Sequence, residues 1–101
     1  MSKLYPLFLS LLLLGAAQAD VVYEVGSKAE ADLKVYVTDN PAEADLKVFK
    51  VSTQDQANKP GLWYFTEYKG QADRKIYFVQ YKQEADLKIR WVDNKGMAGK
   101  R

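Results

Sequence analysis

The chain contains neither cysteine nor histidine in its 101 residues. Without cysteine, no disulfide framework can stabilise the fold. Without either residue, no Ser-His-Asp or Cys-His nucleophile can be assembled, and zinc and copper sites lose their usual ligands. We therefore predict a protein that is not an enzyme and that uses no cofactor or metal.

An excess of charge of one sign is also lacking, since 15 Lys and Arg stand against 13 Asp and Glu. The two signs alternate along the chain, whereas nucleic-acid binders concentrate basic residues, so we expect no nucleic-acid partner. Asp32, Asp45, Asp73 and Asp86 supply the oxygen ligands that calcium prefers. A lysine two residues after each aspartate opposes such a site.

The one long hydrophobic run lies at the start of the chain. Lys3 provides a positive charge, residues 7–17 are almost wholly apolar, and Ala17-Gln18-Ala19 fits the small-x-small cleavage pattern of a signal peptide. The run is shorter than the ~20 residues of a transmembrane helix; an uncleaved anchor is the alternative. We predict a signal peptide over residues 1–19 and an exported protein, periplasmic or secreted, with no membrane contact after cleavage. Residues 20–101 are predicted to form a single domain.

What the chain has in abundance is the tetrapeptide Ala-Asp-x-Lys, followed each time by Val or Ile. A weaker copy at 56–59 and a remnant at Ala19-Asp20 bring the count to six units, and the turn dipeptide Pro60-Gly61 explains one longer step. Residues 23–54 shifted by 41 match residues 64–95 at 12 positions. This indicates two pseudo-symmetric halves, about 20–58 and 59–101. The strongly repeated residues are Ala31, Asp32, Lys34, Ala44, Asp45, Lys47, Ala72, Asp73, Lys75, Ala85, Asp86 and Lys88.

Each unit ends in an alternating run rich in β-branched and aromatic residues, the signal of a β-strand. The runs are 21–25, 33–37, 46–51, 62–67, 75–81 and 87–92. The polar segments between them leave little room for helices, so we predict a compact all-β domain of six strands. Such short connections require consecutive strands to be antiparallel neighbours or the chain to wind around the core. A six-strand antiparallel meander or small barrel is the alternative architecture. The tail, residues 95–101, is predicted to be disordered.

Alternation within each run places the repeated alanine and the apolar residues inward and the Asp–Lys pair outward. We expect the aspartate to accept backbone N–H bonds from its turn and the lysine to pair across strands. A catalytic acid–base role for the pair is the alternative interpretation. Tyr36, Trp63, Tyr77 and Trp91 are candidate ligand-binding residues that could stack sugars or bases, with core packing as the competing role.

The consensus Tyr-Lys-x-Glu-Ala-Asp-Leu-Lys-Val-Tyr-x-Val resembles the repeat of a family of small proteins of unknown function. The resemblance covers the whole mature chain and is most specific at the four Ala-Asp-x-Lys runs, Tyr36 and Tyr77. It implies a compact β fold tied as a seven-crossing torus knot, the septoil, and it implies no activity or site residues. This chain departs from the pattern at Arg74, Asn58, Phe49 and Arg90.

The sequence as a whole predicts a small, exported, non-enzymatic β-repeat protein that is a monomer and has a structural or protein-binding role. The expected partner is an envelope protein or a glycan. The alternative function is a glycan or cell-wall binding module that uses exposed aromatic residues.

Overall fold

The structure, a computed structural model, describes residues 20–100, which are all-β as predicted. The predicted signal peptide lies outside the described residues. The strands are β1 (Asp20–Glu24), β2 (Leu33–Val37), β3 (Leu46–Lys50), β4 (Leu62–Phe65), β5 (Arg74–Phe78), β6 (Leu87–Trp91) and β7 (Gly99–Lys100). Single 3₁₀ turns lie between most of them: η2 (Lys28–Glu30), η3 (Gln54–Gln56), η4 (Lys69–Gln71), η5 (Lys82–Glu84) and η6 (Lys95–Met97).

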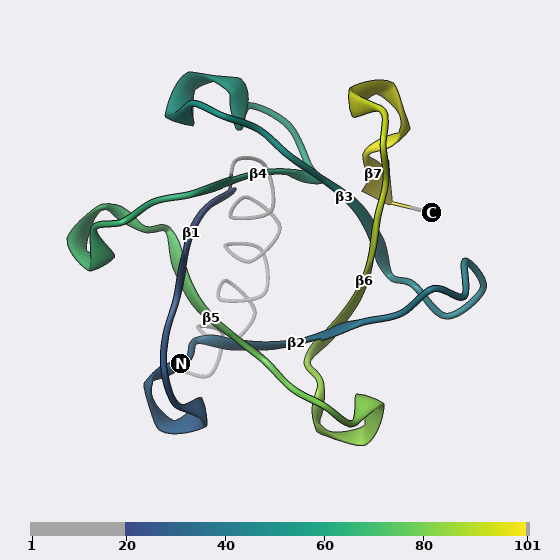
Figure 1. The fold of residues 1–101 in the computed structure, drawn as a ribbon, viewed down its shortest axis with the longest axis horizontal. Helices are drawn as coiled ribbons and strands as arrows, with labels where there is room; N and C mark the ends of the chain where they lie inside the picture. The colour runs from purple at the N-terminus through teal and green to yellow at the C-terminus, as the bar shows by residue number, and fades with distance from the viewer. Residues whose placement is uncertain (1–19, 101) are drawn as a thin grey trace, which may run out of the picture.

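Strands β1 to β6 form one closed ring in the order β1-β5-β2-β6-β3-β4, with β4 paired again to β1. Figure 1 shows this ring from one end, with the turns projecting from it as arms. The antiparallel meander is wrong, because every pairing among these six strands is parallel. Closure of the ring leaves these strands without a long unpaired edge.

Parallel strands tolerate such short connections here because the strands themselves are short. A five-residue strand such as β2 is roughly 17 Å long, and a segment such as residues 25–32 can reach back over that length when extended. Each connection passes the strand that lies between its two ends, except the connection from β3 to β4, which pair directly. Lys28, between β1 and β2, accordingly lines the same pocket as Tyr77 of β5.

Strand β7 completes a regular winding of the chain. The full sheet order is β4-β1-β5-β2-β6-β3-β7, and β7 lies against the residue before β4, since a Cβ on Gly61 would be 2.4 Å from the Gly99 nitrogen. When the seven strands are placed around a ring in this order, each strand lies two positions beyond the strand that precedes it in the chain. The chain therefore winds nearly twice around one axis.

The core is a ring of six inward side chains, one from each long strand. They are Val22, Val35, Val48, Trp63, Ile76 and Ile89, all at most 2% exposed. Leucine and phenylalanine side chains two positions before and after them pack against this ring. Full burial of each such side chain contributes about 1.5–3 kcal/mol, so the ring is a large apolar source of stability. A second buried cluster is formed by Val51, Ala57 and Leu62.

The register revises the predicted repeat at both ends. Because Val22 takes the position of Val35, Asp20 falls at the position of Leu33, so the anchor placed at Ala19-Asp20 was wrong by one residue. At the other end, Ala98 begins a partial seventh unit. The prediction of a disordered tail was also wrong: residues 95–100 form η6 and β7, and β7 pairs antiparallel with β3.

Candidate functional site

Each strongly repeated aspartate links the starts of two neighbouring strands by reciprocal hydrogen bonds. The Asp32 N–H donates to the carbonyl oxygen of Lys75 at 2.7 Å, and the Lys75 N–H donates back to Asp32 Oδ2 at 2.9 Å. The same exchange joins Asp45 to Lys88, Asp86 to Lys34 and Asp73 to Val21. The carboxylate therefore reaches the next strand instead of its own turn, and it acts as a clamp between strands.

The repeated lysines approach the same carboxylates with their side chains. Lys34, Lys75 and Lys88 place Nζ at 3.7, 3.7 and 3.9 Å from Oδ2 of the aspartate on the neighbouring strand. These pairs are about one-third exposed or more, so each contributes at most about 1 kcal/mol. Lys47 makes no such pair in the described residues, because Gly99 occupies the aspartate position of the seventh unit.

The strand clamps give the repeated aspartates a structural role. Each of the four carboxylates already accepts a backbone N–H, and the four lie on four different strand pairs. Within residues 20–100, no group of three or more acidic side chains is arranged to hold a metal ion. No helix in the same range is long and apolar enough to cross a membrane.

The arms are joined to one another by ion pairs around part of the ring. Lys28 Nζ lies 2.8 Å from Glu84 Oε1, Lys82 Nζ lies 2.7 Å from Glu43 Oε2, and Lys69 Nζ lies 3.6 Å from Glu30 Oε1. Hydrogen bonding to Glu84 raises the pKa of Lys28, and hydrogen bonding to Glu43 raises the pKa of Lys82. The bond from Lys82 in turn lowers the pKa of Glu43.

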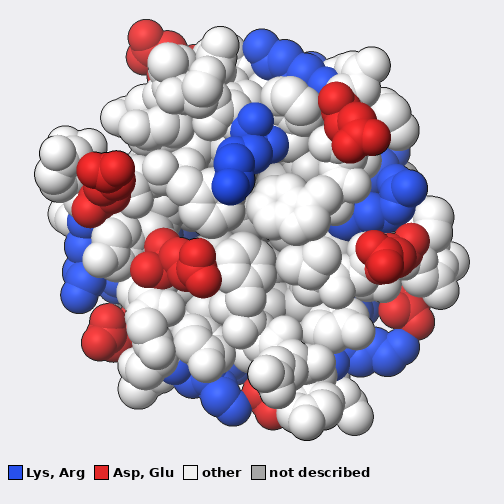
Figure 2. Space-filling view, viewed as in Figure 1, with Lys and Arg blue, Asp and Glu red and all other residues white. Residues whose placement is uncertain are grey.

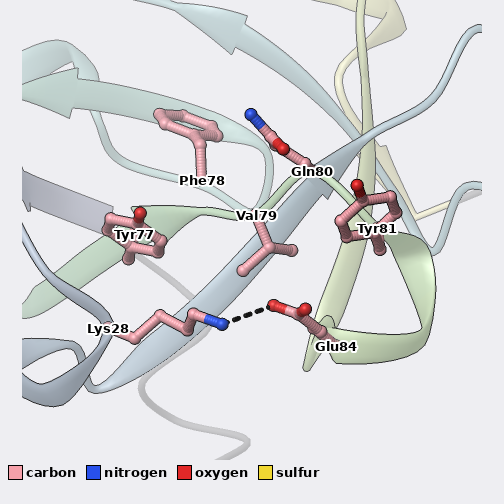
Figure 3. A pocket seen from close by; sticks show the side chains of 7 residues that line it. All are labelled: Lys28, Tyr77, Phe78, Val79, Gln80, Tyr81 and Glu84. Carbon is pink, nitrogen blue, oxygen red and sulfur yellow. Dashed lines mark hydrogen bonds and ion pairs between the residues drawn. The ribbon is translucent and has the colours of Figure 1, made fainter.

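A groove of about 320 Å³ lies beside the ion pair of arms η2 and η5 (Figure 3). Tyr77 and Tyr81 stand on either side of Val79, and the Lys28–Glu84 pair closes one end. Tyr81 is 60% exposed. The groove therefore combines two tyrosine rings with the ammonium donor of Lys28 and the carboxylate acceptor of Glu84.

An aromatic cluster occupies the ends of three strands inside the ring. Trp91 contacts Phe65 and Phe78 at ring-centroid distances of 6.3 and 6.5 Å, and Lys50 Nζ lies 4.8 Å from the centre of the Phe65 ring. Trp91 remains 39% exposed and Val37, at the same level of β2, 37%. We call Phe65, Phe78, Trp91 and Val37 the aromatic end of the ring.

Charges of both signs surround the ring. In the face shown in Figure 2, acidic and basic side chains alternate around the rim, and most of the central surface is uncharged. No large patch of one sign is visible on this face.

Comparison with known proteins assigns the fold to a family. A family model described as the 7(1) septoil knot domain matches residues 19–101. The chain belongs to the septoil knot family. Searches of curated proteins and of solved structures returned no match.

The four predicted ligand-binding aromatics of this septoil knot domain do not form one platform. Tyr36 and Tyr77 are half-buried on the outer side of β2 and β5, and Trp91 belongs to the aromatic end. Trp63 is 2% exposed and belongs to the core ring. Of the four, only Tyr77 lines the groove of Figure 3.

The alanines of the septoil repeat vary in their burial. Ala44 and Ala57 are buried, whereas Ala31, Ala72 and Ala85 are half-buried beside their 3₁₀ turns. Two features escaped sequence reasoning, the seventh unit and the exposure of Tyr81. The first was detectable, because Ala98 follows Ala85 by the same interval as Ala44 follows Ala31.

Proposed function

We propose that this chain is an exported, non-enzymatic β-repeat scaffold that binds another protein through the aromatic end of its ring. The observation that carries the proposal is the partial exposure of Trp91 and Val37 above a packed aromatic cluster. Tryptophan, tyrosine and arginine are enriched among the residues that dominate binding energy at protein interfaces. The repeated Asp–Lys groups, by contrast, are already engaged in strand clamps.

The composition of the aromatic end defines the partner surface that would fit. Phe65, Phe78 and Trp91 provide an apolar centre, while Lys50 and Glu24 lie at the same level of β3 and β1 and carry opposite charges. A partner with an apolar side chain flanked by charges of both signs complements this arrangement.

The test is capture of an envelope protein by purified wild type and by Trp91→Ala. We expect the substitution to lower the recovery of a specific partner about tenfold or more, because truncating an interface tryptophan commonly costs over 2 kcal/mol. Tyr68→Ala is the matched control, since Tyr68 is 64% exposed but lies on the arm outside the cluster. Undiminished recovery with Trp91→Ala would overturn the proposal.

A glycan-binding role is the second candidate, and the groove between η2 and η5 supports it. Tyr77 and Tyr81 offer rings for stacking against a sugar, and Lys28 and Glu84 offer polar groups to its hydroxyls. A glycan array probed with wild type and with Tyr77→Ala/Tyr81→Ala tests this role. Binding that survives the double substitution contradicts it, and loss of protein capture without loss of glycan binding separates the two candidates.

We also propose that the winding is tied as the torus knot of the family. The support is the two-place step between successive strands around seven places and the position of β7 at the end of that winding. Pulling a single molecule from both ends tests it. A knotted chain should retain a tight knot after unfolding, so its extended length should fall short of the full contour length. Recovery of the full length would contradict knotting.

Export is tested by the mature N-terminus. Cleavage after Ala19 predicts that protein recovered from the periplasm or the medium begins at Asp20. A chain that still begins at Met1 and remains in the cytoplasm would contradict the signal peptide.

A further inference from the structure

A second cavity lies at the opposite end of the ring from the aromatic end, where the strands begin. It has a volume of about 220 Å³. Its lining residues are Asp20, Asp45, Leu46, Pro60, Trp63, Arg74, Leu87 and Lys100. They come from the starts of β1, β3, β5 and β6, from the residues in and before β4, and from β7. Its size suits a small metabolite, since pockets for drug-sized ligands run from about 300 Å³ upward.

Two charged residues at this end replace leucines of the repeat. Asp20 in the first unit and Arg74 in the fifth occupy the positions that Leu33, Leu46 and Leu87 hold in theirs. Arg74 Nε lies 3.6 Å from Asp20 Oδ1, and the Asp20 side chain is only 5% exposed. The separation exceeds that of a hydrogen bond, so the two groups face each other without being locked together.

Two buried polar atoms of the lining residues are left without a hydrogen bond. They are Asp20 Oδ1, an acceptor, and Trp63 Nε1, a donor. Burial raises the pKa of the Asp20 carboxyl, and Arg74 and the Trp63 N–H oppose this rise. The contact between the indole N–H and the carboxyl falls outside hydrogen-bond geometry. Buried polar groups in native proteins are nearly always hydrogen-bonded, so a donor and an acceptor left unpaired beside one cavity require an explanation.

Side chains of both signs line the cavity, which restricts the ligand class. Asp45 is already paired with Lys88, so Asp20 and Arg74 are the two facing charges, and a simple cation or anion would meet one attractive and one repulsive group. A zwitterion satisfies both signs at once. Leu46, Leu87, Pro60 and the Trp63 ring supply apolar walls beside these charges.

We propose that this cavity binds a free α-amino acid with an apolar side chain. The ammonium group meets Asp20 Oδ1, the carboxylate meets the Arg74 guanidinium and the Trp63 N–H, and the side chain lies against Leu46 and Leu87. A single zwitterionic ligand would then bond to both unpaired atoms, Asp20 Oδ1 and Trp63 Nε1, and pair with both facing charges, Asp20 and Arg74. This site is separate from the protein-binding surface proposed above, which lies at the other end of the ring.

The experiment follows the two tryptophan indole N–H signals by NMR while free L-leucine is added to the purified protein. We expect a saturable shift of the Trp63 signal and none of the Trp91 signal. Two analogues test the two charged groups of leucine separately, because 4-methylpentanoate lacks the ammonium group and leucinamide lacks the carboxylate. Both should bind about tenfold more weakly than leucine, or worse.

The matched variant is Asp20→Leu/Arg74→Leu, which restores the leucine of the other units and retains the apolar walls. It should abolish the saturable shift. Asp20→Asn, which keeps the size of the side chain, should raise the Kd for leucine about tenfold or more and serves if the double variant does not fold. The proposal is overturned if leucine gives no saturable shift, or if 4-methylpentanoate and leucinamide both bind as tightly as leucine. It is also overturned if the folded variants bind leucine as tightly as wild type does.

Discussion

At the scale of single residues, one repeated aspartate position joins the starts of neighbouring strands. Its backbone N–H and its carboxylate bond to the same residue of the neighbouring strand, as Asp86 does with Lys34. The pair extends the parallel ladder by one step beyond the start of the strand. Gly99 holds the same position in the seventh unit and has no carboxylate with which to form this clamp.

Loss of one clamp should therefore destabilise the whole domain. We expect Asp86→Ala to lower the free energy of unfolding by about 0.5–1.5 kcal/mol, because the exposed Lys34 N–H exchanges its carboxylate acceptor for water. Asp93→Ala is the control; Asp93 is exposed and should change stability by less than about 0.5 kcal/mol. Urea unfolding measures both, and equal effects would mean that the clamp is not a source of stability.

The Asp20–Arg74 pair gives a second prediction, on pH. Burial raises the pKa of the Asp20 carboxyl, against the opposing effects of Arg74 and the Trp63 N–H. A carboxyl whose pKa is raised in the folded state favours folding below its ordinary value of 3.8 and loses that contribution as the pH rises through the raised value.

Replacing the pair by Asp20→Leu/Arg74→Leu removes this cost. We expect the variant to be more stable than wild type at neutral pH, since apolar replacements of buried ion pairs are often stabilising. The gain should shrink as the pH falls below 3.8. Urea unfolding at both pH values measures it, and a gain that grows on acidification would contradict the assigned direction.

At the scale of elements, the shortest strand, β7, completes the pairing of β3. The two extra residues Pro60 and Gly61 interrupt the pairing of β4 with the start of β3, and β7 pairs there with Leu46 and Lys47 instead. Gly61 permits the fit, because its φ is +90° and a Cβ there would lie 2.5 Å from the Lys47 carbonyl oxygen.

Gly61→Ala should consequently displace β7. We expect a loss of about 1–3 kcal/mol from the positive φ alone, with more from the contact to Gly99. Gly26→Ala is the matched control, since no atom lies within 4 Å of the added Cβ. Faster amide hydrogen exchange at residues 99–100 in Gly61→Ala would report the displacement, and exchange unchanged from wild type would contradict it.

At the scale of the whole molecule, the two halves of the sequence are interleaved. Strands β1 to β3 belong to residues 20–58 and β4 to β7 to residues 59–101, and every one of the seven pairings joins a strand of one half to a strand of the other. The sequence symmetry therefore describes two interlocked sets of strands and not two compact subdomains.

It follows that neither half should fold alone. We expect peptides 20–58 and 59–101 to lack β structure separately, since each half has no partner strand within itself. Circular dichroism of each peptide, with the intact chain as control, measures this. A folded signal from either peptide by itself would contradict the interleaved arrangement.

Sequence reasoning reached the strands, the all-β class and the family, because alternation and a repeated motif are local properties. It could not reach the strand order, because near-identical units give no pattern that says which one is the neighbour of which. Asp20 was misplaced since the repeat decays there. Trp63 was taken as a possible surface residue, although its interval of 13 from Ile76 places it in the core ring.

Interleaving also sets the time at which the protein can begin to fold. Because no strand finds a partner within residues 20–58, the first half of the chain has nothing to pair with until the second half has been made. The place beside Gly61 is filled only by the last residues. If the chain is exported as proposed, this delay would keep it loose enough to be threaded through a translocation channel before the ring closes.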